Sequence, residues 1–336
     1  MRFTFERDHI LLAEGVREFL AKECTPADVR ASWESETGRS PERWRKLAEL
    51  GVIGLTAPQT AGGLGLDELA LVLILEETGR AALPEPVIEH VGVAVPLLAS
   101  AAPVGRLAAR WLGPAASGEA IVSVGFEGQP FVADAHVADM LLLEKGGHLH
   151  LVAPADCDIT AQPSVDRSRR LFSVEWAHGA GTPMFPGDRA LAYDRGVLGA
   201  SAQLLGVARQ LIDMTAAYAR ERRQFGQPIG SFQAVKHHLA NALLALELAR
   251  PVVYRAAWSV ARTTPTRSVD VSMAKAYASD AANLAARVAL QVHGAIGYTW
   301  ECDAHLWMKR AWALGSAWGD AASHRRRVAV AALGPA

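Results

Sequence analysis

The chain has 336 residues, of which 50% are hydrophobic and 21% charged, and its formal net charge is −1. This balance is typical of a folded globular protein large enough for two or three structural units, and it excludes an extended disordered chain. Because the net charge is close to zero, nothing attracts nucleic acid or an anionic membrane surface, and we expect neither as a partner.

The three cysteines, Cys24, Cys157 and Cys302, are far apart in the sequence. Their spacing indicates neither a disulfide framework nor a metal site, and it is typical of a reducing compartment. The apolar runs at 69–75 and 91–102 are too short, or too interrupted by Pro and Gly, to span a bilayer, and residues 1–20 lack the apolar core of a signal peptide. We therefore expect a cytoplasmic protein without a metal ion.

The first third of the chain has the periodicity of helices. Ile10, Leu11, Val16 and Phe19 form an apolar stripe that predicts one amphipathic helix over residues 3–30. Ser40 and Pro41 begin a second helix that ends at Gly51. A glycine-rich loop at 57–66, a third helix at 67–79 and a further helical pattern from 86 to about 112 follow.

The pattern changes near Gly113. Short apolar runs at 121–124, 137–143, 149–152 and 171–176, separated by Gly, Pro and Asp, predict short antiparallel strands. From Tyr193 onward four long helical stretches with alanine-rich faces predict a four-helix bundle. The sequence thus indicates a mostly helical α+β fold with an N-terminal helical domain (1–116), a small β domain (117–191) and a C-terminal helical bundle (192–336).

The segment 219–240, ARERRQFGQPIGSFQAVKHHLA, combines a cluster of charges with a helix break. Gly226, Pro228 and Gly230 interrupt the helix, and Ser231 can cap the one that follows. Arginines, backbone amides and a helix N-terminus in one corner suit a pyrophosphate. A solvated basic turn between two helices is the alternative reading of the same residues.

Two blocks resemble the acyl-CoA dehydrogenase family. The first runs from Arg222 to Gln233 (RRQFGQPIGSFQ), and the second is QVHGAIGYTWE at 291–301, in which Ala295 replaces a glycine of the family motif. Weaker similarity at 58–66 and 76–79 extends the resemblance over most of the chain. It implies the family's fold, FAD as cofactor, and formation of an α,β-double bond in an acyl-CoA thioester.

In the family a glutamate removes the α-proton, and this chain departs from that pattern. Counting from Gly297 and Tyr298 places Trp318 at the usual glutamate position, and the second position used in the family holds Gly196. Neither residue can accept a proton. The carboxylates near these two positions are Asp320, Glu301 and Asp194, and we expect each of them to be a helix cap or a surface charge rather than the base.

The resemblance also divides the flavin site unequally. The family's Thr-Glu-x-x-x-Gly-Ser-Asp segment has no counterpart here, because the sequence at 124–128 reads VGFEG. The residues that would reach the FAD of a neighbouring subunit are retained: Arg222, Gln224, Phe225, Gln233, Gln291 and Gly294. The chain therefore retains the residues that would contact the FAD of a neighbouring subunit, and it lacks much of the segment that would hold a FAD of its own.

Three functions fit these residues. The first is one subunit of a heteromeric acyl-CoA dehydrogenase, whose larger partner supplies the base, for a bulky, steroid-type acyl-CoA. The second is a self-sufficient homomeric dehydrogenase in which Asp320 or Glu301 is the base. The third is a flavin-free scaffolding protein with the same fold.

Overall fold

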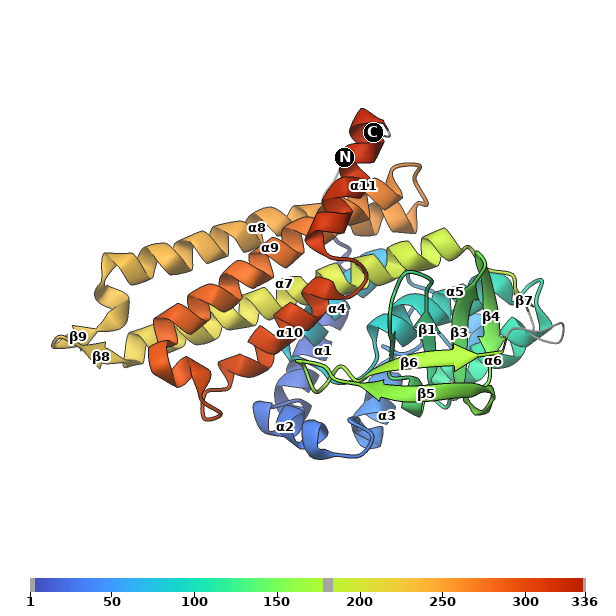
Figure 1. The fold of residues 1–336 in the computed structure, drawn as a ribbon, viewed down its shortest axis with the longest axis horizontal. Helices are drawn as coiled ribbons and strands as arrows, with labels where there is room; N and C mark the ends of the chain where they lie inside the picture. The colour runs from blue at the N-terminus through green and yellow to red at the C-terminus, as the bar shows by residue number, and fades with distance from the viewer. Residues whose placement is uncertain (1–3, 178–183, 335–336) are drawn as a thin grey trace.

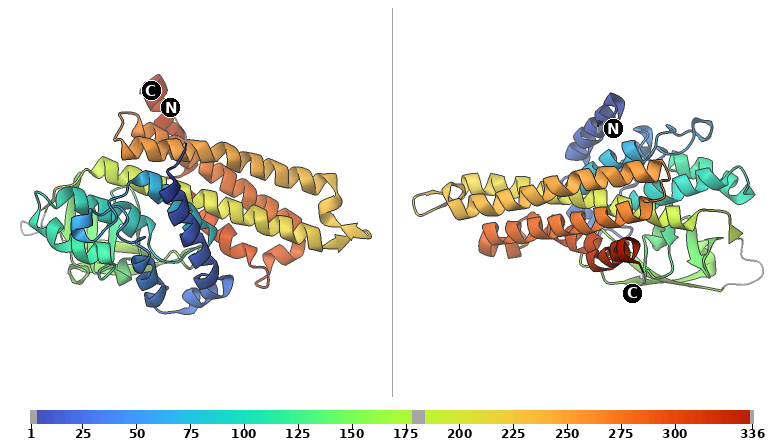
Figure 2. Two further views of the ribbon diagram at one scale, coloured as in Figure 1. Left: turned by 180° about the vertical axis from the view of Figure 1, so that it is seen from behind. Right: turned by 90° about the horizontal axis from the view of Figure 1, so that it is seen from above.

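The computed structural model describes residues 4–177 and 184–334 (Figure 1). Its first third is helical, as predicted. The helices are α1 (Arg7–Glu23), α2 (Pro26–Glu34), α3 (Pro41–Glu49), α4 (Glu68–Arg80), the π-helical η2 (Ile88–Ala94), α5 (Val95–Ala101) and α6 (Arg106–Ser117), with the 3-10 turn η1 (Gln59–Ala61) between α3 and α4. Together they cover one side of the sheet region and one end of the C-terminal bundle (Figure 2).

The predicted single helix over 3–30 is wrong, because the chain turns between α1 and α2. Thr25 and Asp28 form a reciprocal capping box, and Pro26 occupies the first helical position of α2. Proline cannot donate the backbone hydrogen bond that would continue α1. The helix therefore ends there, although the apolar pattern of the sequence continues into α2. The helical pattern at 86–112 is similarly interrupted between α5 and α6, at residues 102–105.

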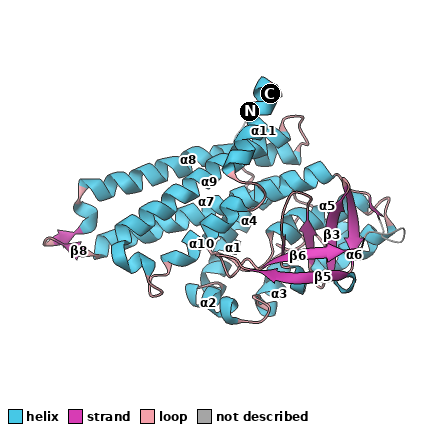
Figure 3. Ribbon diagram, viewed as in Figure 1, coloured by secondary structure: helices cyan, strands magenta, loops and turns pink. Residues whose placement is uncertain are grey.

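The β region lies at one end of the molecule, where Figure 3 shows the strands together. One sheet has the order β1 (Val122–Gly125), β3 (Met140–Lys145), β4 (His148–Val152), β7 (Met184–Phe185), and the other has the order β2 (Val132–Ala133), β6 (Leu171–Trp176), β5 (Cys157–Gln162). Short 3-10 turns lie at Ala135–Val137 (η3) and Pro154–Asp156 (η4). A small separate core, which includes Leu141, Val152 and Phe172, joins the two sheets.

Two features of the β region differ from the sequence-based expectation. The β1–β3 pair is parallel, with Val122 opposite Met140, whereas we expected only antiparallel strands. Strand β5 was not predicted, because its residues CDITAQ are largely exposed or half-buried and carry no apolar run. The run at 137–143 becomes a strand only from Met140, after the turn η3.

The C-terminal region is a bundle around α7 (Arg189–Glu221), packed by α8 (Gln233–Ala261), α9 (Arg267–His293) and α10 (Ala304–Ser316), as predicted. A fifth helix, α11 (Ala321–Leu333), leaves the bundle (Figure 1). Helix α4 crosses α7 closely at Gly206, where a Cβ would overlap the carbonyl oxygen of Glu76. That close crossing gives the N-terminal helices and the bundle one continuous hydrophobic core.

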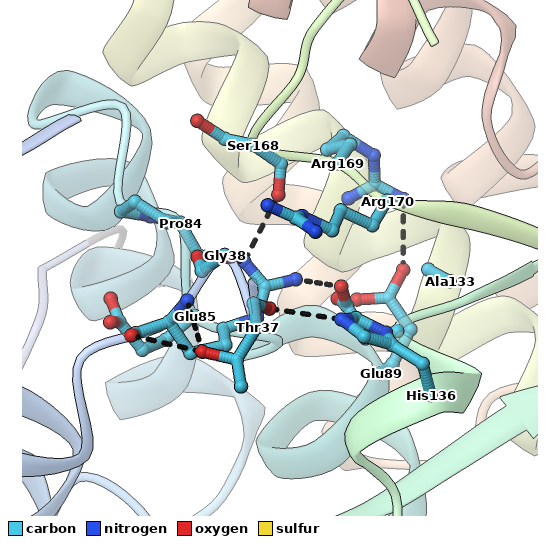
Figure 4. Close-up of polar contacts among 12 residues, drawn as sticks. Thr37, Gly38, Pro84, Glu85, Glu89, Ala133, His136, Ser168, Arg169 and Arg170 are labelled. Carbon is cyan, nitrogen blue, oxygen red and sulfur yellow. Dashed lines mark hydrogen bonds and ion pairs between the residues drawn. The ribbon is translucent and has the colours of Figure 1, made fainter. Parts of the chain in front are cut away.

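A buried polar cluster ties the N-terminal helices to the sheets (Figure 4). Arg39 forms an ion pair with Asp134 and donates to the carbonyl oxygen of Ser168 at 3.0 Å. Glu89 pairs with Arg169 at 3.0 Å, while Glu85 accepts two hydrogen bonds from Arg43 near by. Because buried charges are costly unless they are paired, these contacts fix how the loop at 163–170 lies against η2.

Candidate functional site

The first family-like block forms a tight hairpin between α7 and α8, at the end of the bundle far from the sheets (Figure 3). Strands β8 (Arg223–Gln224) and β9 (Gln227–Pro228) pair, and Phe225 and Gly226 turn the chain with φ values of 52° and 81°. Two successive positive φ values are typical of a two-residue hairpin loop. The Phe225 side chain is consequently 92% exposed.

The second block follows α9 at the same end of the bundle. Helix α9 ends at Gly294, whose φ of 66° and ψ of −142° favour glycine, and the short helix η6 (Gly294–Tyr298) follows. Tyr218 near the end of α7 stacks on His293, with ring centroids 4.4 Å apart and an angle of 20° between the planes. This stack connects the helix that leads into the hairpin with the helix that leads into the glycine turn.

The predicted cofactor residues lie at this end of the bundle and face solvent. Arg222, Gln224, Phe225, Gln233, Gln291 and Gly294 are all exposed. Within the described residues no carboxylate forms an ion pair with Arg222, and Glu247 of α8 contacts Arg209 and Arg250 instead. A free guanidinium beside amide side chains is a suitable donor set for a pyrophosphate that approaches from outside the chain.

One local expectation at this site is wrong. Ser231 does not cap α8, because its hydroxyl donates to the carbonyl oxygen of Pro228 at 2.7 Å. Phe232 is the N-cap residue and makes no side-chain capping bond, so the first amide groups of α8 have no side-chain acceptor from Ser231. His237 and His238 are exposed on α8, and among the described residues no cluster of His, Cys, Asp or Glu could hold a metal ion.

The two positions that hold the base in the family meet at the other end of the bundle. A Cβ built on Gly196 would lie 2.5 Å from Cη2 of Trp318 and closer still to two other ring atoms, so the indole occupies the space above this glycine. Trp318 is 4% exposed and packs on Phe126 and Tyr193, with centroids 5.5 and 5.8 Å away. Neither Phe126 nor Tyr193 was singled out in the sequence.

The corner that carries Trp318 is held from several sides. Trp318 has φ +58°, and its carbonyl oxygen accepts hydrogen bonds from the Tyr193 hydroxyl at 3.2 Å and from Nε2 of His324 at 2.8 Å. Lys275, fully buried, donates from Nζ to the carbonyl oxygens of Gly315 and Gly319 at 3.0 and 2.8 Å. A left-handed conformation at tryptophan is strained and persists only where the surroundings fix it, as they do here.

The two fallback carboxylates, Asp320 and Glu301, are both exposed. Asp320 caps α11 by accepting from the backbone N–H of Ser323 at 2.7 Å, and this bond lowers the pKa of its exposed carboxyl group. Glu301 is exposed before the start of α10, whereas Trp318 follows its end, and a helix of 13 residues separates them by about 20 Å. Neither is placed beside Gly196 in the manner of a base held in a dry site.

Asp194, one helical step from Tyr193, is the buried carboxylate nearest to Gly196 in the chain. Its side chain accepts from the Ser268 hydroxyl at 2.6 Å and from Arg267 at 3.2 Å, and Arg327 lies 3.6 Å away. Burial raises its pKa despite these partners. Two arginines and a hydroxyl thus hold Asp194 in an ion-pair cluster.

Two cavities flank the aromatic cluster of Phe126, Tyr193 and Trp318. One, of about 370 Å³, lies between the sheets and α10 and has Trp318 in its wall. The other, of about 350 Å³, lies at the start of α7 and has Phe126 and Tyr193 in its wall. Both include Gly128 and Gln129, so the two cavities adjoin there, and the aromatic cluster contributes a wall to each.

The N-terminal helices, the small sheets and the C-terminal helical bundle together have the architecture of an acyl-CoA dehydrogenase. Family models match residues 6–119 ("Acyl-CoA dehydrogenase, N-terminal domain") and 188–333 ("Acyl-CoA dehydrogenase, C-terminal domain"). The chain therefore belongs to the acyl-CoA dehydrogenase family, whose members are FAD-dependent oxidoreductases that act on the CH–CH group of acyl-CoA.

Individual relatives agree with this assignment. The chain is 37% identical over 305 residues to acyl-CoA dehydrogenase IpdE2 of Mycolicibacterium smegmatis, covering 90% of this chain and 91% of the relative. It superposes on a chain of the ChsE4–ChsE5 complex from Mycobacterium tuberculosis with TM-score 0.89, 29% identity and full coverage of both chains. The Tcur3481–Tcur3483 steroid ACAD shares the fold, with TM-score 0.86, 24% identity and 96% coverage of each chain.

No helix among the described residues is both long enough and apolar enough to cross a bilayer.

Proposed function

We propose that this chain is one subunit of a heteromeric FAD-dependent acyl-CoA dehydrogenase. In this assembly Arg222, Phe225 and Gln291 bind the FAD that a larger partner subunit holds, and the partner's carboxylate removes the α-proton. When bound, the flavin supplies the hydride acceptor for the dehydrogenation. The contact of Trp318 with Gly196 is the observation that carries the proposal, because it leaves no carboxylate and no room at this chain's own reaction site.

The outward-facing end of the bundle supports the same division of labour. Arg222 has no carboxylate partner among the described residues, and Phe225 is 92% exposed on a strained turn. A large exposed aromatic side chain beside an unpaired arginine is typical of a surface that another molecule covers. A FAD molecule in the partner's β domain would cover this surface.

The proposed substrate is a bulky, steroid-type acyl-CoA in the cytoplasm. Two structural relatives support this proposal, since one is a ChsE4–ChsE5 complex of two different chains and another is described as a steroid ACAD. Because this chain would bind no substrate of its own, the larger subunit could use a wide cavity for a bulky acyl group. The alternatives remain a homomer that relies on Asp320 or Glu301, and a flavin-free scaffold.

Co-expression with a larger acyl-CoA dehydrogenase homologue tests the proposal. We expect co-purification of the two chains with bound FAD and acyl-CoA dehydrogenase activity. Arg222→Ala in this chain should reduce FAD retention at least tenfold without loss of assembly, whereas Arg326→Ala, at an exposed arginine of α11, should change neither. Turnover by this chain alone, lost on Asp320→Asn or Glu301→Gln, would instead establish the homomer.

A further inference from the structure

We infer that Trp318 closes a cleft through this subunit that would otherwise accept an acyl-CoA, so that Trp318 is the residue that excludes substrate from this chain. The inference deepens the proposed function and rests on it. The evidence is the pair of cavities on either side of the aromatic cluster, which share Gly128 and Gln129 but have different other wall residues.

The two cavities differ in chemistry. The cavity at the start of α7 is charged, because Arg189 and Arg327 lie in its wall together with Glu127, Glu144 and Asp194. The cavity between the sheets and α10 is more apolar: apart from the ion pair of Glu89 and Arg169, its wall includes Phe131, Val165, Leu171, Trp312 and Ala313. Two adjoining cavities, one lined mainly by charges and the other more apolar, suit an elongated ligand with a polar head and an apolar body.

Each cavity alone is small for such a ligand. Volumes of about 370 and 350 Å³ are near the lower end of the range of about 300–1,000 Å³ that small-molecule sites occupy. The indole of Trp318, packed between Phe126 and Gly196, prevents a single ligand from occupying both. Removal of this one side chain would take away the wall, or partition, between the cavities, and Gly196 beneath it has no side chain to fill the space.

The partition is fixed rather than mobile. The carbonyl oxygen of Trp318 accepts two hydrogen bonds, from Tyr193 and His324, and Lys275 holds the carbonyl groups of Gly315 and Gly319 on either side. These bonds fix the backbone that carries the indole, and the indole itself is buried against Phe126, Tyr193 and Gly196, so swinging it out would remove this packing. In this arrangement the wild-type chain is closed to acyl-CoA.

The aromatic cluster also contacts an arginine in the wall of the charged cavity. Arg327 lies over the ring of Tyr193, with its Cζ 5.5 Å from the centroid, and 3.6 Å from Asp194. The Arg189 guanidinium pairs with Glu144 in the same wall. Both arginines are thus occupied by carboxylates of this chain, although a ligand phosphate that entered an opened cleft would find them within its wall.

Isothermal titration of the isolated chain with octanoyl-CoA tests the inference. The variant is Trp318→Gly, because glycine suits the φ of +58° at this position and leaves no side chain. We expect no saturable binding by the wild type and saturable binding by Trp318→Gly. Coenzyme A without the acyl chain should bind the variant more weakly, since it reaches only the charged cavity.

The matched control is Trp312→Gly. Trp312 is 42% exposed and borders only the apolar cavity of the pair, so its removal enlarges that cavity without opening the partition. This control should bind no better than the wild type. Folding is checked by elution volume and thermal melting. If Trp318→Gly does not fold, Trp318→Leu and Phe126→Ala carry the test, because each thins the partition.

Two results would overturn the inference: equal binding by the wild type and Trp318→Gly, or no binding by a folded partition variant. Heteromer formation is measured separately, by co-purification with the larger subunit. If Trp318→Gly gains octanoyl-CoA binding while the wild-type chain never pairs with a partner, the inference about Trp318 stands and the proposed function is refuted. The reverse outcome would refute the inference alone.

Discussion

Trp318 lies directly over Gly196, so that the two positions where the family keeps a catalytic carboxylate are filled by one indole resting on a bare backbone. The contact joins the corner after α10 to the second turn of α7. The absence of a glutamate and the absence of room for a substrate thus have one cause, because the indole of Trp318 fits only while position 196 lacks a side chain.

Gly196→Ala should therefore destabilise the protein. The new Cβ would lie within 2.5 Å of the Trp318 ring, and overpacking of this kind costs about 1–3 kcal/mol of unfolding free energy. The matched control is Gly113→Ala in α6, where a Cβ meets no atom within 4 Å and the change should be neutral or stabilising by up to about 1 kcal/mol. Urea unfolding measures both.

The same substitution should be harmless once the indole is removed. In a Trp318→Gly background, Gly196→Ala should cost less than about 0.5 kcal/mol, because no ring remains for the Cβ to meet. Equal costs in the two backgrounds would show that position 196 is sensitive for another reason.

Lys275 should make stability depend on pH above neutrality. Burial lowers the pKa of its amino group to about 7, whereas an unfolded lysine titrates near 10.4. Between these values the unfolded chain binds more protons, so the free energy of unfolding should rise with pH by at most about 1.4 kcal/mol per unit. Lys275→Met should remove this rise, and Lys236→Met, at an exposed lysine of α8, should retain it.

His90 should contribute to instability in acid. Its Nδ1 accepts from the N–H of Val122 at 3.0 Å, Nε2 donates to the carbonyl oxygen of Ala115 at 3.0 Å, and burial lowers its pKa to about 4. Because its folded pKa is below the unfolded value of about 6.5, stability is lost as pH falls from about 6.5 toward 4. His90→Phe should flatten this part of the pH profile, and His238→Phe, at an exposed histidine, should not.

The stack of Tyr218 on His293 should hold the hairpin at 222–228 and the glycine turn at 294–298 in the positions in which both bind FAD. With the ring centroids 4.4 Å apart, Tyr218→Phe retains the stack, whereas Tyr218→Ala removes it and frees the glycine turn from the hairpin. We expect the heteromer to lose FAD several-fold faster with the alanine variant and at the wild-type rate with phenylalanine. Unchanged retention with alanine would mean that each turn is held by its own helix.

The sequence predicted the parts of this structure that follow from local pattern. Helical periodicity located α3, α4 and the bundle, and the two family-like blocks identified turns that do lie at one end of it. Local pattern could not reveal that Thr25 and Pro26 end a helix within an unbroken apolar stripe, or that β1 pairs in parallel with β3. Pairing direction and helix breaks of this kind depend on tertiary contacts.

The sequence predicted that the reaction site lacks a base, but it did not predict that the site is closed. Counting along the motifs located Trp318 and Gly196 separately as unsuitable bases, but nothing in their neighbourhoods indicated that one covers the other. Phe126, Tyr193, Lys275 and His324 complete the corner from four different segments, so no spacing pattern connects them. The one available signal was that Phe126 lies in the VGFEG stretch, where the family's flavin-lining segment is missing.

The visible flavin spectrum, with the ratio of FAD to polypeptide, tests the central claim most directly. The chain purified alone should be colourless, and its complex with a larger acyl-CoA dehydrogenase subunit should contain one FAD for each pair of chains. A yellow protein with one FAD per chain, able to dehydrogenate an acyl-CoA by itself, would contradict the account.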